Sequence, residues 1–456
     1  MRLFRTLLLC SSLAALAACG RYADEQAGEF ADAVAVLDPA DQVLPDLELA
    51  GQAIDLPAAS FNTDWTQVGG NAGHAPGHLV GPEIIDRAWR ARGVSSKAKG
   101  APISAPPVVD TERLYTIDAV ASIQAFDVAD GERVWQTTLT PDVRDPKVRF
   151  YNIFGRVNAR DLGFGGGAAV QDGQLFVTSG FGFIASLDAA TGEILWKVDT
   201  ASPMRNPPTV SGGLVIAVSI SNQVYALDAQ TGEEVWTFES FEEPARVIAS
   251  AAPAVQGESI VVPFSSGEIV SLNLSNGRVN WQAVISRTSR LNALSVLGDI
   301  AGSPVADRGA VFSVSQSGQM VGIDLRTGAV AWEQPVGGSN TPWVAGETIF
   351  VLSNQGTLSA LNRIDGRVRW VVELPTWRNE RREKGRSIWA GPVLASGRLY
   401  LTSTGGEMIA VAPQTGEIVD RYRLGEAATQ PPIVAAGTIY VMTEDGVIHA
   451  FRDAAL

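Results

Sequence analysis

The chain has few of the side chains on which most catalytic centres depend. Its 456 residues include two cysteines and three histidines, His74, His78 and His449. The His74-x-x-x-His78 spacing falls in a segment rich in glycine and proline, so it does not predict two rings on one helical face of a metal site. No Gly-x-Ser-x-Gly nucleophile motif and no phosphate-binding loop occurs. These absences argue against an enzyme.

Positive charge is also scarce. The formal net charge is −14, and the first 18 residues carry only Arg2 and Arg5, so their removal would leave −16. Nucleic acid and anionic lipid surfaces are therefore unfavourable partners.

The N-terminus reads as an export signal. A basic start, Met1-Arg-Leu-Phe-Arg5, precedes a short apolar run from Leu7 to Leu16, and Leu16-Ala-Ala-Cys19 matches the bacterial lipobox. Since Cys10 would leave with the signal (residues 1–18), the mature chain would keep Cys19 as its one thiol, which predicts lipid attachment there. A plain secretory signal or a short membrane helix is the alternative, although the apolar run is too short to span a bilayer comfortably.

An acidic stretch follows the predicted lipidation site. Residues 20–60 hold nine acids against one base, Arg21, with little aromatic content. We expect residues 19–60 to be the lipidated N-terminus and a mostly extended linker, with a short helix around Glu25 to Val36 as an alternative.

A repeat dominates residues 61–456. Its clearest copy is Ser186-Leu-Asp-Ala-Ala-Thr-Gly-Glu-Ile-Leu-Trp196, which follows short alternating strands bounded by glycine turns. Six copies place Asp or Asn eight residues before a tryptophan, and these end at Trp135, Trp196, Trp236, Trp281, Trp332 and Trp370. We expect each tryptophan to pack between neighbouring repeats, with a ligand-stacking box as the alternative.

The ends of the repeat array complement one another. A seventh copy, 410–420, loses the tryptophan, and an eighth, from Gln430, stops before its outer strand, whereas Pro82-Glu-Ile-Ile-Asp-Arg-Ala-Trp89 resembles that missing strand. The sequence therefore predicts an all-β, eight-bladed β-propeller of four-stranded antiparallel blades, its last blade closed by the N-terminal strand. An open solenoid would need capping repeats, which are not evident.

Connector lengths distinguish the two faces of such a ring. The turns inside the repeats are short, and three connections between repeats are long: Thr140 to Phe164, Ile285 to Asp299, and Leu374 to Ile388. Long loops on a rigid scaffold favour a binding face, with harmless insertions as the alternative. The third connection contains the basic run Arg378–Arg386, and the first has a second basic cluster, either of which could orient an acidic partner.

The Ala-Leu-Asp-x-x-Thr-Gly-Glu-x-x-Trp repeat resembles that of the quinoprotein (PQQ-type) propellers. With the lipobox, the acidic spacer and eight simple blades, the chain is similar to the BamB family, lipoproteins of the outer-membrane β-barrel assembly (BAM) machine. The resemblance implies a non-catalytic scaffold without a cofactor, which binds the POTRA domains of BamA and aids outer-membrane protein clients. It also implies outer-membrane sorting, because Gly20 rather than aspartate follows Cys19, and a lipid-anchored protein that faces the periplasm.

The resemblance assigns contacts to the stretches 243–253 and 296–304. Asp299 occupies an acidic contact position and Val247 an apolar one, while Ala301 stands where a second acid is expected. Ile248 stands where the resemblance implies an arginine, and Arg246 lies two places earlier. Ala245 stands where the resemblance implies a larger apolar residue. We expect Arg246, Val247, Ile248 and Asp299 to form the partner-binding site, with Asp299 outside the core.

Two other functions remain as alternatives. A PQQ-dependent dehydrogenase uses the same eight-bladed ring, but such enzymes typically have adjacent cysteines, a calcium site and a catalytic aspartate, and here the repeated aspartates are explained by their turns. A propeller that serves another envelope complex or a polysaccharide is the second.

Overall fold

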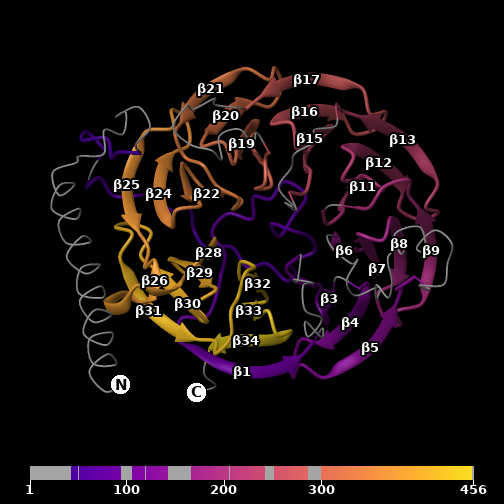
Figure 1. Cartoon of the computed structure of the whole chain (residues 1–456), viewed down its shortest axis with the longest axis horizontal. Coiled ribbons are helices and arrows are strands. Elements are labelled where there is room, and N and C mark those ends of the chain that lie inside the picture. Colours follow the sequence, from indigo (N-terminus) through magenta and orange to yellow (C-terminus); the bar gives the residue numbers. More distant parts are fainter. Residues whose placement is uncertain are drawn as a thin grey trace, which may run out of the picture. The chain divides into compact units, whose positions relative to one another are not determined.

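The described residues between 43 and 453 form one closed ring of sheets (Figure 1). The computed structural model describes residues 43–49, 51–93, 105–118, 120–141, 166–204, 206–241, 251–285 and 299–453. The predicted signal peptide, Cys19 and the possible helix at 25–36 lie outside the described residues. Eight sheets, each with four antiparallel strands, surround the ring axis, which confirms the predicted eight-bladed propeller.

The blades are numbered in chain order, and their strands run from the axis outward. Blade 1 contains β2 (Val108–Val109), β3 (Arg113–Ile117), β4 (Ser122–Asp127) and β5 (Arg133–Thr138). Blade 2 contains β6 (Gly166–Gln171), β7 (Gln174–Ser179), β8 (Phe183–Asp188) and β9 (Ile194–Asp199). Blade 3 contains β10 (Thr209–Ser211), β11 (Leu214–Val218), β12 (Gln223–Asp228) and β13 (Glu234–Glu239). Blade 4 contains β14 (Ala254–Gln256), β15 (Ser259–Pro263), β16 (Glu268–Asn273) and β17 (Val279–Val284).

The second half of the ring repeats this order. Blade 5 contains β18 (Val305–Asp307), β19 (Ala310–Val314), β20 (Met320–Asp324) and β21 (Val330–Gln334). Blade 6 contains β22 (Trp343–Ala345), β23 (Thr348–Leu352), β24 (Thr357–Asn362) and β25 (Val368–Glu373). Blade 7 contains β28 (Trp389–Ala395), β29 (Arg398–Ser403), β30 (Glu407–Val411) and β31 (Ile418–Arg423). Blade 8 contains β32 (Ile433–Ala435), β33 (Thr438–Met442), β34 (Val447–Asp453) and β1 (Ile85–Arg92).

The repeated Asp-x-x-Thr-Gly sequence forms the turn between the third and fourth strands of a blade. In blade 2 the Asp188 carboxylate accepts hydrogen bonds from the amide and the hydroxyl of Thr191, at 2.7 and 3.0 Å. The amide of Gly192 donates to the Asp188 carbonyl at 2.8 Å, and Gly192 has φ +75°, which glycine adopts without strain. Hydrogen bonds from Thr191 lower the pKa of Asp188, so this aspartate is a turn residue.

The tryptophans join neighbouring blades, as the repeat predicted. In blade 1 the Trp135 indole Nε1 donates to the Ala189 carbonyl of blade 2 at 3.0 Å, and the ring lies against Gly192 of the same turn. Six other tryptophans donate in the same way to the following blade: Trp89 to Val128, Trp196 to Ala229, Trp236 to Leu274, Trp281 to Leu325, Trp332 to Arg363, and Trp370 to Pro413. Each contact combines burial of a large ring with a satisfied indole donor.

The N-terminal strand completes blade 8. β1 pairs antiparallel with β34, from Ile85 opposite Asp453 to Arg92 opposite Val447, so it starts slightly later than the 82–89 segment expected. Trp89 of this strand donates to Val128 of blade 1 at 3.0 Å. The junction therefore joins the first and last strands of the ring and leaves no open edge between the first and last blades.

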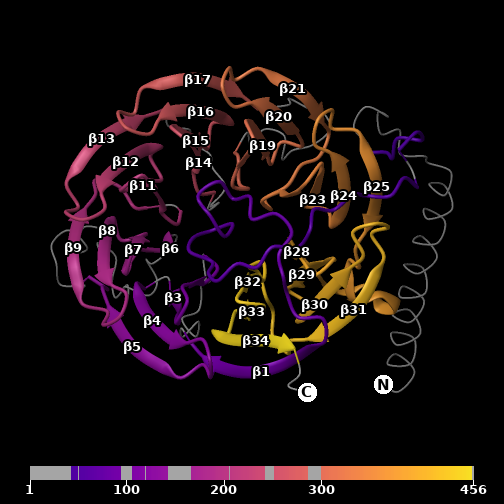
Figure 2. The ribbon, with the colours of Figure 1, turned by 180° about the vertical axis from the view of Figure 1, so that it is seen from behind.

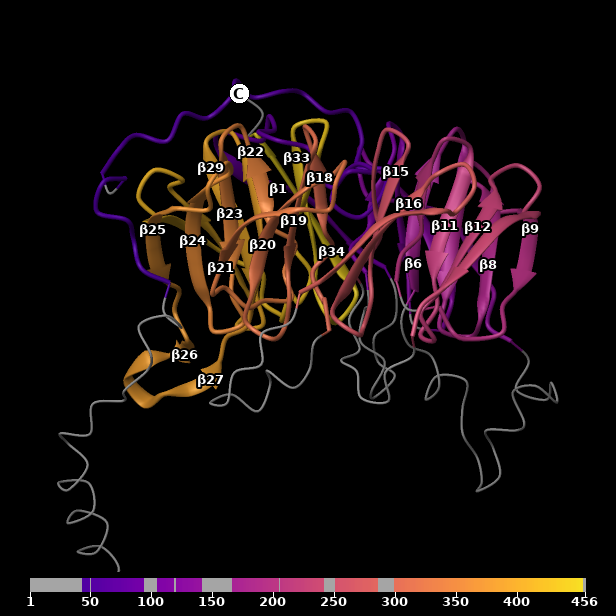
Figure 3. The ribbon, with the colours of Figure 1, turned by 90° about the horizontal axis from the view of Figure 1, so that it is seen from above.

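A segment without any repeat crosses one end of the ring (Figures 2 and 3). This strap, residues 60–81, hydrogen-bonds the blades in ring order, from blade 8 through blades 1 to 7. In that order the contacts are Asn62–Val434, Trp65–Val109, Thr66–Val170, Gln67–Val210, Ala72–Val255, Gly73–Ala306, Gly77–Trp343 and Leu79–Leu394. The strap therefore ties all eight blades together at their axial ends.

The expected flexible linker ends earlier than residue 60. The Asp46 amide donates to the Val368 carbonyl at 2.8 Å, its carboxylate pairs with Arg367 at 2.7 Å, and Ile54 exchanges two backbone hydrogen bonds with the Gln414 side chain. Ile54 is only 4% exposed. Parts of the stretch 43–60 thus lie against the ring, where Leu49 and Ile54 are buried although Leu44 and Leu47 stay exposed.

Candidate partner-binding face

The two ends of the ring differ. The strap lies at one end, the strap face. The turns between the first and second strands and between the third and fourth strands of each blade lie at the same end. The connections between blades lie at the other, the link face, which also bears a hairpin made of β26 (Trp377–Asn379), the 3₁₀ turn η4 (Glu380–Arg382) and β27 (Lys384–Arg386) (Figure 3). Of the three long connections, 374–388 is described, whereas most of the other two, residues 142–165 and 286–298, lies outside the described residues.

Asp299 does not lie where we expected it. Its side chain is 1% exposed, and the following Ile300 and Ala301 are also buried. The Asp299 carbonyl accepts the Gln316 amide at 2.9 Å, so the chain is already part of blade 5 at this point. The expectation of a side chain outside the core was wrong, because the approach to β18 runs inward against the neighbouring turn. Arg246, Val247 and Ile248 lie outside the described residues.

Two exposed apolar side chains lie beside these stretches, and the sequence reasoning missed both. Phe241, two residues beyond β13, is 80% exposed, and Val284, the last residue of β17, is 62% exposed. They are close to each other, because Val284 lies opposite Glu268, and the Glu268 carboxylate accepts the Ser240 hydroxyl at 2.9 Å. A large apolar residue at the end of an outer strand, followed by a long connection, was the available signal.

Hydrogen bonds hold this region in a fixed arrangement. Glu268 also accepts from Ser266 at 3.0 Å and from Gln282 at 2.7 Å. The Ala252 amide donates to Ser303 at 2.9 Å, which links the first residues of blades 4 and 5. An apolar pair on a rigid polar base is the arrangement expected of a protein-binding surface rather than of a catalytic centre.

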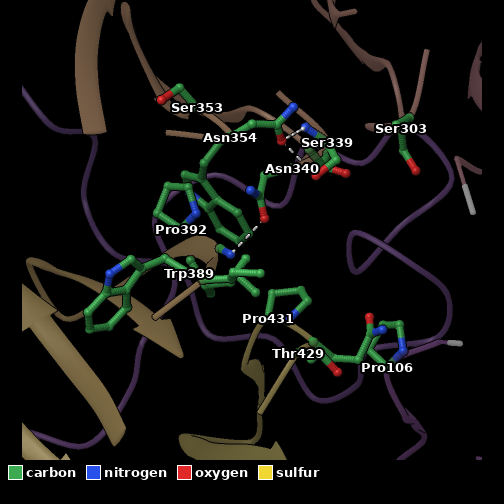
Figure 4. A pocket seen from close by; sticks show the side chains of 18 of the residues that line it. Pro106, Ser303, Ser339, Asn340, Ser353, Asn354, Trp389, Pro392, Thr429 and Pro431 are labelled. Carbon is green, nitrogen blue, oxygen red and sulfur yellow. Dashed lines mark hydrogen bonds between the residues drawn. The ribbon is translucent and has the colours of Figure 1, made fainter. Parts of the chain in front are cut away.

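A cavity of about 370 Å³ occupies the ring axis below the strap. Figure 4 shows Asn340, Asn354, Pro392 and Pro431 around it, with Asn340 accepting from the Gly391 amide at 3.2 Å. Arg386 is the one charged side chain in its described lining, which also includes the buried His74. With no carboxylate in that lining, the residues do not fit the calcium-bound quinone of a PQQ dehydrogenase.

The histidines are used by the fold. His74 is buried, and its Nδ1 lies 2.7 Å from the Pro304 carbonyl, where burial lowers its pKa to about 4. His78 contacts the Pro57 carbonyl at 2.7 Å and accepts the Gly397 amide at 2.9 Å. Burial, followed by the charges of Arg87 and Arg90, likewise lowers the pKa of His449 to about 4. Within the described ranges, no cluster of three His, Cys, Asp or Glu side chains could hold a metal ion.

Comparison with solved structures concerns the fold, and comparison of sequences concerns the family. A BamB from Moraxella catarrhalis superposes with a TM-score of 0.65 at 19% identity, over 81% of this chain and 100% of that one. A europium-containing methanol dehydrogenase superposes equally well, with a TM-score of 0.66 at 14% identity, over 86% and 98%. Since both a BamB and a dehydrogenase share the ring, the fold by itself does not separate a scaffold from an enzyme. In the described part of the chain, no helix has the length and apolar character needed to cross a membrane.

Sequence comparison shows the family. The outer membrane protein assembly factor BamB of Burkholderia pseudomallei (strain K96243) is 27% identical over 372 residues, 81% of this chain and 88% of that protein. The BamB of Shewanella oneidensis is 24% identical over 75% of this chain and 82% of its own. The family profile described as outer membrane protein assembly factor BamB matches residues 119–372 and 375–455. This chain, a closed eight-bladed ring, therefore belongs to the BamB family.

Proposed function

We propose that this protein is a non-catalytic scaffold lipoprotein of the outer-membrane β-barrel protein assembly machine. Membership of the BamB family, whose members are named outer membrane protein assembly factors, carries the proposal. The absence of carboxylates from the described cavity lining and the structural use of the repeated aspartates support a binding role over PQQ-dependent oxidation. The lipobox at Cys19 supports attachment to the outer membrane, with the propeller in the periplasm.

We further propose that the link face at blades 3 to 5 binds the POTRA domains of a BamA-type protein. Phe241 and Val284 supply the described apolar anchors, and Arg246, Val247 and Ile248 would extend the same surface. Asp299 is buried and its carbonyl accepts the Gln316 amide, so we expect it to position the chain ahead of β18 and not to contact the partner directly. Exposed aromatic and aliphatic anchors at a rigid site are typical centres of protein interfaces.

Binding of the lipidated protein, or of its soluble form, to isolated POTRA domains tests this proposal. Phe241→Asp and Val284→Asp should each weaken binding by about 1 to 3 kcal/mol, because each replaces an apolar anchor by a charge. Ile364→Asp is the matched control: Ile364 is 71% exposed but lies in a third-to-fourth strand turn on the strap face. All three side chains are exposed, so the variants should unfold like the parent.

The outcomes separate the parts of the proposal. Equal binding by all three variants would move the interface away from Phe241 and Val284. Failure of the parent protein to bind POTRA domains at all, with no BamA-type barrel recovered from mild detergent, would contradict the assembly role. The role of Asp299 is tested with Asp299→Asn. This substitution removes the charge but keeps the shape of a residue that is only 1% exposed, so it disturbs the packing less than a larger basic residue would.

A further inference from the structure

The hairpin β26–β27 is a fixed projection of the link face. At its base the Ser387 amide donates to the Thr376 carbonyl at 2.8 Å, and Ile388 donates to Thr404 of blade 7 at 2.9 Å. The Trp389 indole donates to the Pro375 carbonyl at 2.9 Å. These bonds hold both arms of the hairpin on the ring, so the side chains along it keep a defined position relative to blade 7.

The hairpin concentrates positive charge on an acidic protein. Residues 378–386 hold five bases and two acids, in a chain with a net charge of −14. The five basic side chains, Arg378, Arg381, Arg382, Lys384 and Arg386, are all exposed. In the part of the chain that the structure describes, none of them forms an ion pair with a carboxylate.

A groove of about 670 Å³ separates the hairpin from blade 7. Three arginines line it, Arg378 from the hairpin and Arg421 and Arg423 from β31, whereas Glu407 is the one carboxylate of its described lining. Glu407 pairs with Arg421 at 3.3 Å, so Arg378 and Arg423 keep their charge unpaired among the described residues. Pro375 and Trp377 form an apolar wall, and Gly405, Gly406 and Gly425 bring bare backbone to the surface.

We propose that this groove binds an extended, acidic segment of a partner protein. Carboxylates of the segment would contact Arg378 and Arg423, whose planar guanidinium groups can each donate two parallel hydrogen bonds to a carboxylate. An apolar side chain of the segment would lie on Trp377. The glycine backbone allows a close approach of an extended chain. This surface lies on blade 7, apart from Phe241 and Val284 on blades 3 and 4, and the inference does not depend on the proposed function.

Charge favours a peptide over an anionic membrane. The hairpin attracts anions over a Debye length of about 8 Å at physiological salt, but a bilayer surface would also meet the negative body of the propeller. An extended peptide is narrow enough to contact the positive groove without approaching the negative surface around it. The apolar wall adds a contact that a protein segment uses and that a phosphate head group does not.

Selection from a displayed library of random 12-residue peptides on the immobilised soluble protein tests the inference. Selected peptides should be enriched in Asp and Glu next to one apolar residue. Their affinity, measured by fluorescence anisotropy of labelled copies, should fall at least tenfold for Arg378→Glu/Arg423→Glu. The control Arg278→Glu/Arg326→Glu makes the same charge change at two exposed turn arginines of the strap face and should leave binding unchanged.

Two results would overturn the inference. Either the selected peptides are not acidic, or they bind both double variants equally. Vesicles containing phosphatidylglycerol provide a further arm: tighter binding to these vesicles than to the peptides, lost in Arg378→Glu/Arg423→Glu, would assign the groove to a lipid surface instead. Circular dichroism of both double variants verifies that they fold like the parent.

Discussion

Gly192 and Gly173 allow the packing between blades to be measured separately from backbone strain. Both lie in blade 2 with nearly the same backbone, φ +75° and +77°. A Cβ on Gly192 would lie 2.5 Å from the Trp135 ring and 2.8 Å from the Thr137 hydroxyl, whereas a Cβ on Gly173 would meet nothing within 4 Å. Alanine at either position therefore has the same conformational cost, but only Gly192→Ala forces the tryptophan of blade 1 to move.

The expected magnitudes follow from these distances. An L-residue in the left-handed region costs about 1 to 2 kcal/mol relative to glycine, which is the whole loss expected for Gly173→Ala. Overpacking a rigid contact adds about 1 to 3 kcal/mol, so Gly192→Ala should lose that much more. In the same contact the Ala189 carbonyl accepts a hydrogen bond from the Trp135 indole. Displacement of the ring therefore also weakens that hydrogen bond.

Urea unfolding followed by far-ultraviolet circular dichroism measures both losses. A double-mutant cycle with Trp135→Leu adds an independent test, because a smaller side chain leaves room for the new methyl group. Gly192→Ala should then cost no more than Gly173→Ala in that background. Equal losses for the two glycine variants in the parent, or strict additivity in the cycle, would refute the assignment of Gly192 to the contact between blades.

Three further predictions concern pH, anchoring and cofactor. Because burial lowers the pKa of His74 and His449 from 6.5 to about 4, the unfolded chain binds more protons between these values. The free energy of unfolding should therefore fall as the pH drops below 6.5, by about 1 kcal/mol per histidine between pH 7 and 5.5. In urea titrations at several pH values, His74→Gln/His449→Gln should reduce this dependence on pH. An unchanged dependence would contradict the burial of the two neutral rings as its cause. Cys19→Ala should abolish labelling with radioactive palmitate and release the protein from the outer membrane with its circular dichroism intact; persistent labelling would disprove the lipobox assignment. The soluble domain should neither bind PQQ in an absorbance titration nor reduce a dye acceptor, with or without calcium, and saturable binding with turnover would reverse the non-enzymatic assignment.

The sequence by itself determined the parts of this protein that repeat. The Asp-x-x-Thr-Gly turn depends on hydrogen bonds between residues three or four apart, so each copy predicts its own hairpin. The eight-residue spacing to tryptophan and the unpaired eighth copy then predict the number of blades and the closing strand, which β1 and Trp89 confirm. These signals are local or periodic, and no knowledge of distant contacts is needed to read them.

Only the tertiary structure decided how the segments without a repeat are placed. The strap has no periodicity, and its contacts join residues far apart in the chain, from Trp65 with Val109 to Leu79 with Leu394, which is 315 positions away. Asp299 occupies an ordinary position in the sequence and is buried only because the approach to β18 turns inward. The proximity of Phe241 to Val284, and of Arg378 to Arg423, likewise arises when ring closure and blade packing bring separate strands and connections together. Such contacts depend on the geometry of the whole ring, which no local pattern of residues encodes.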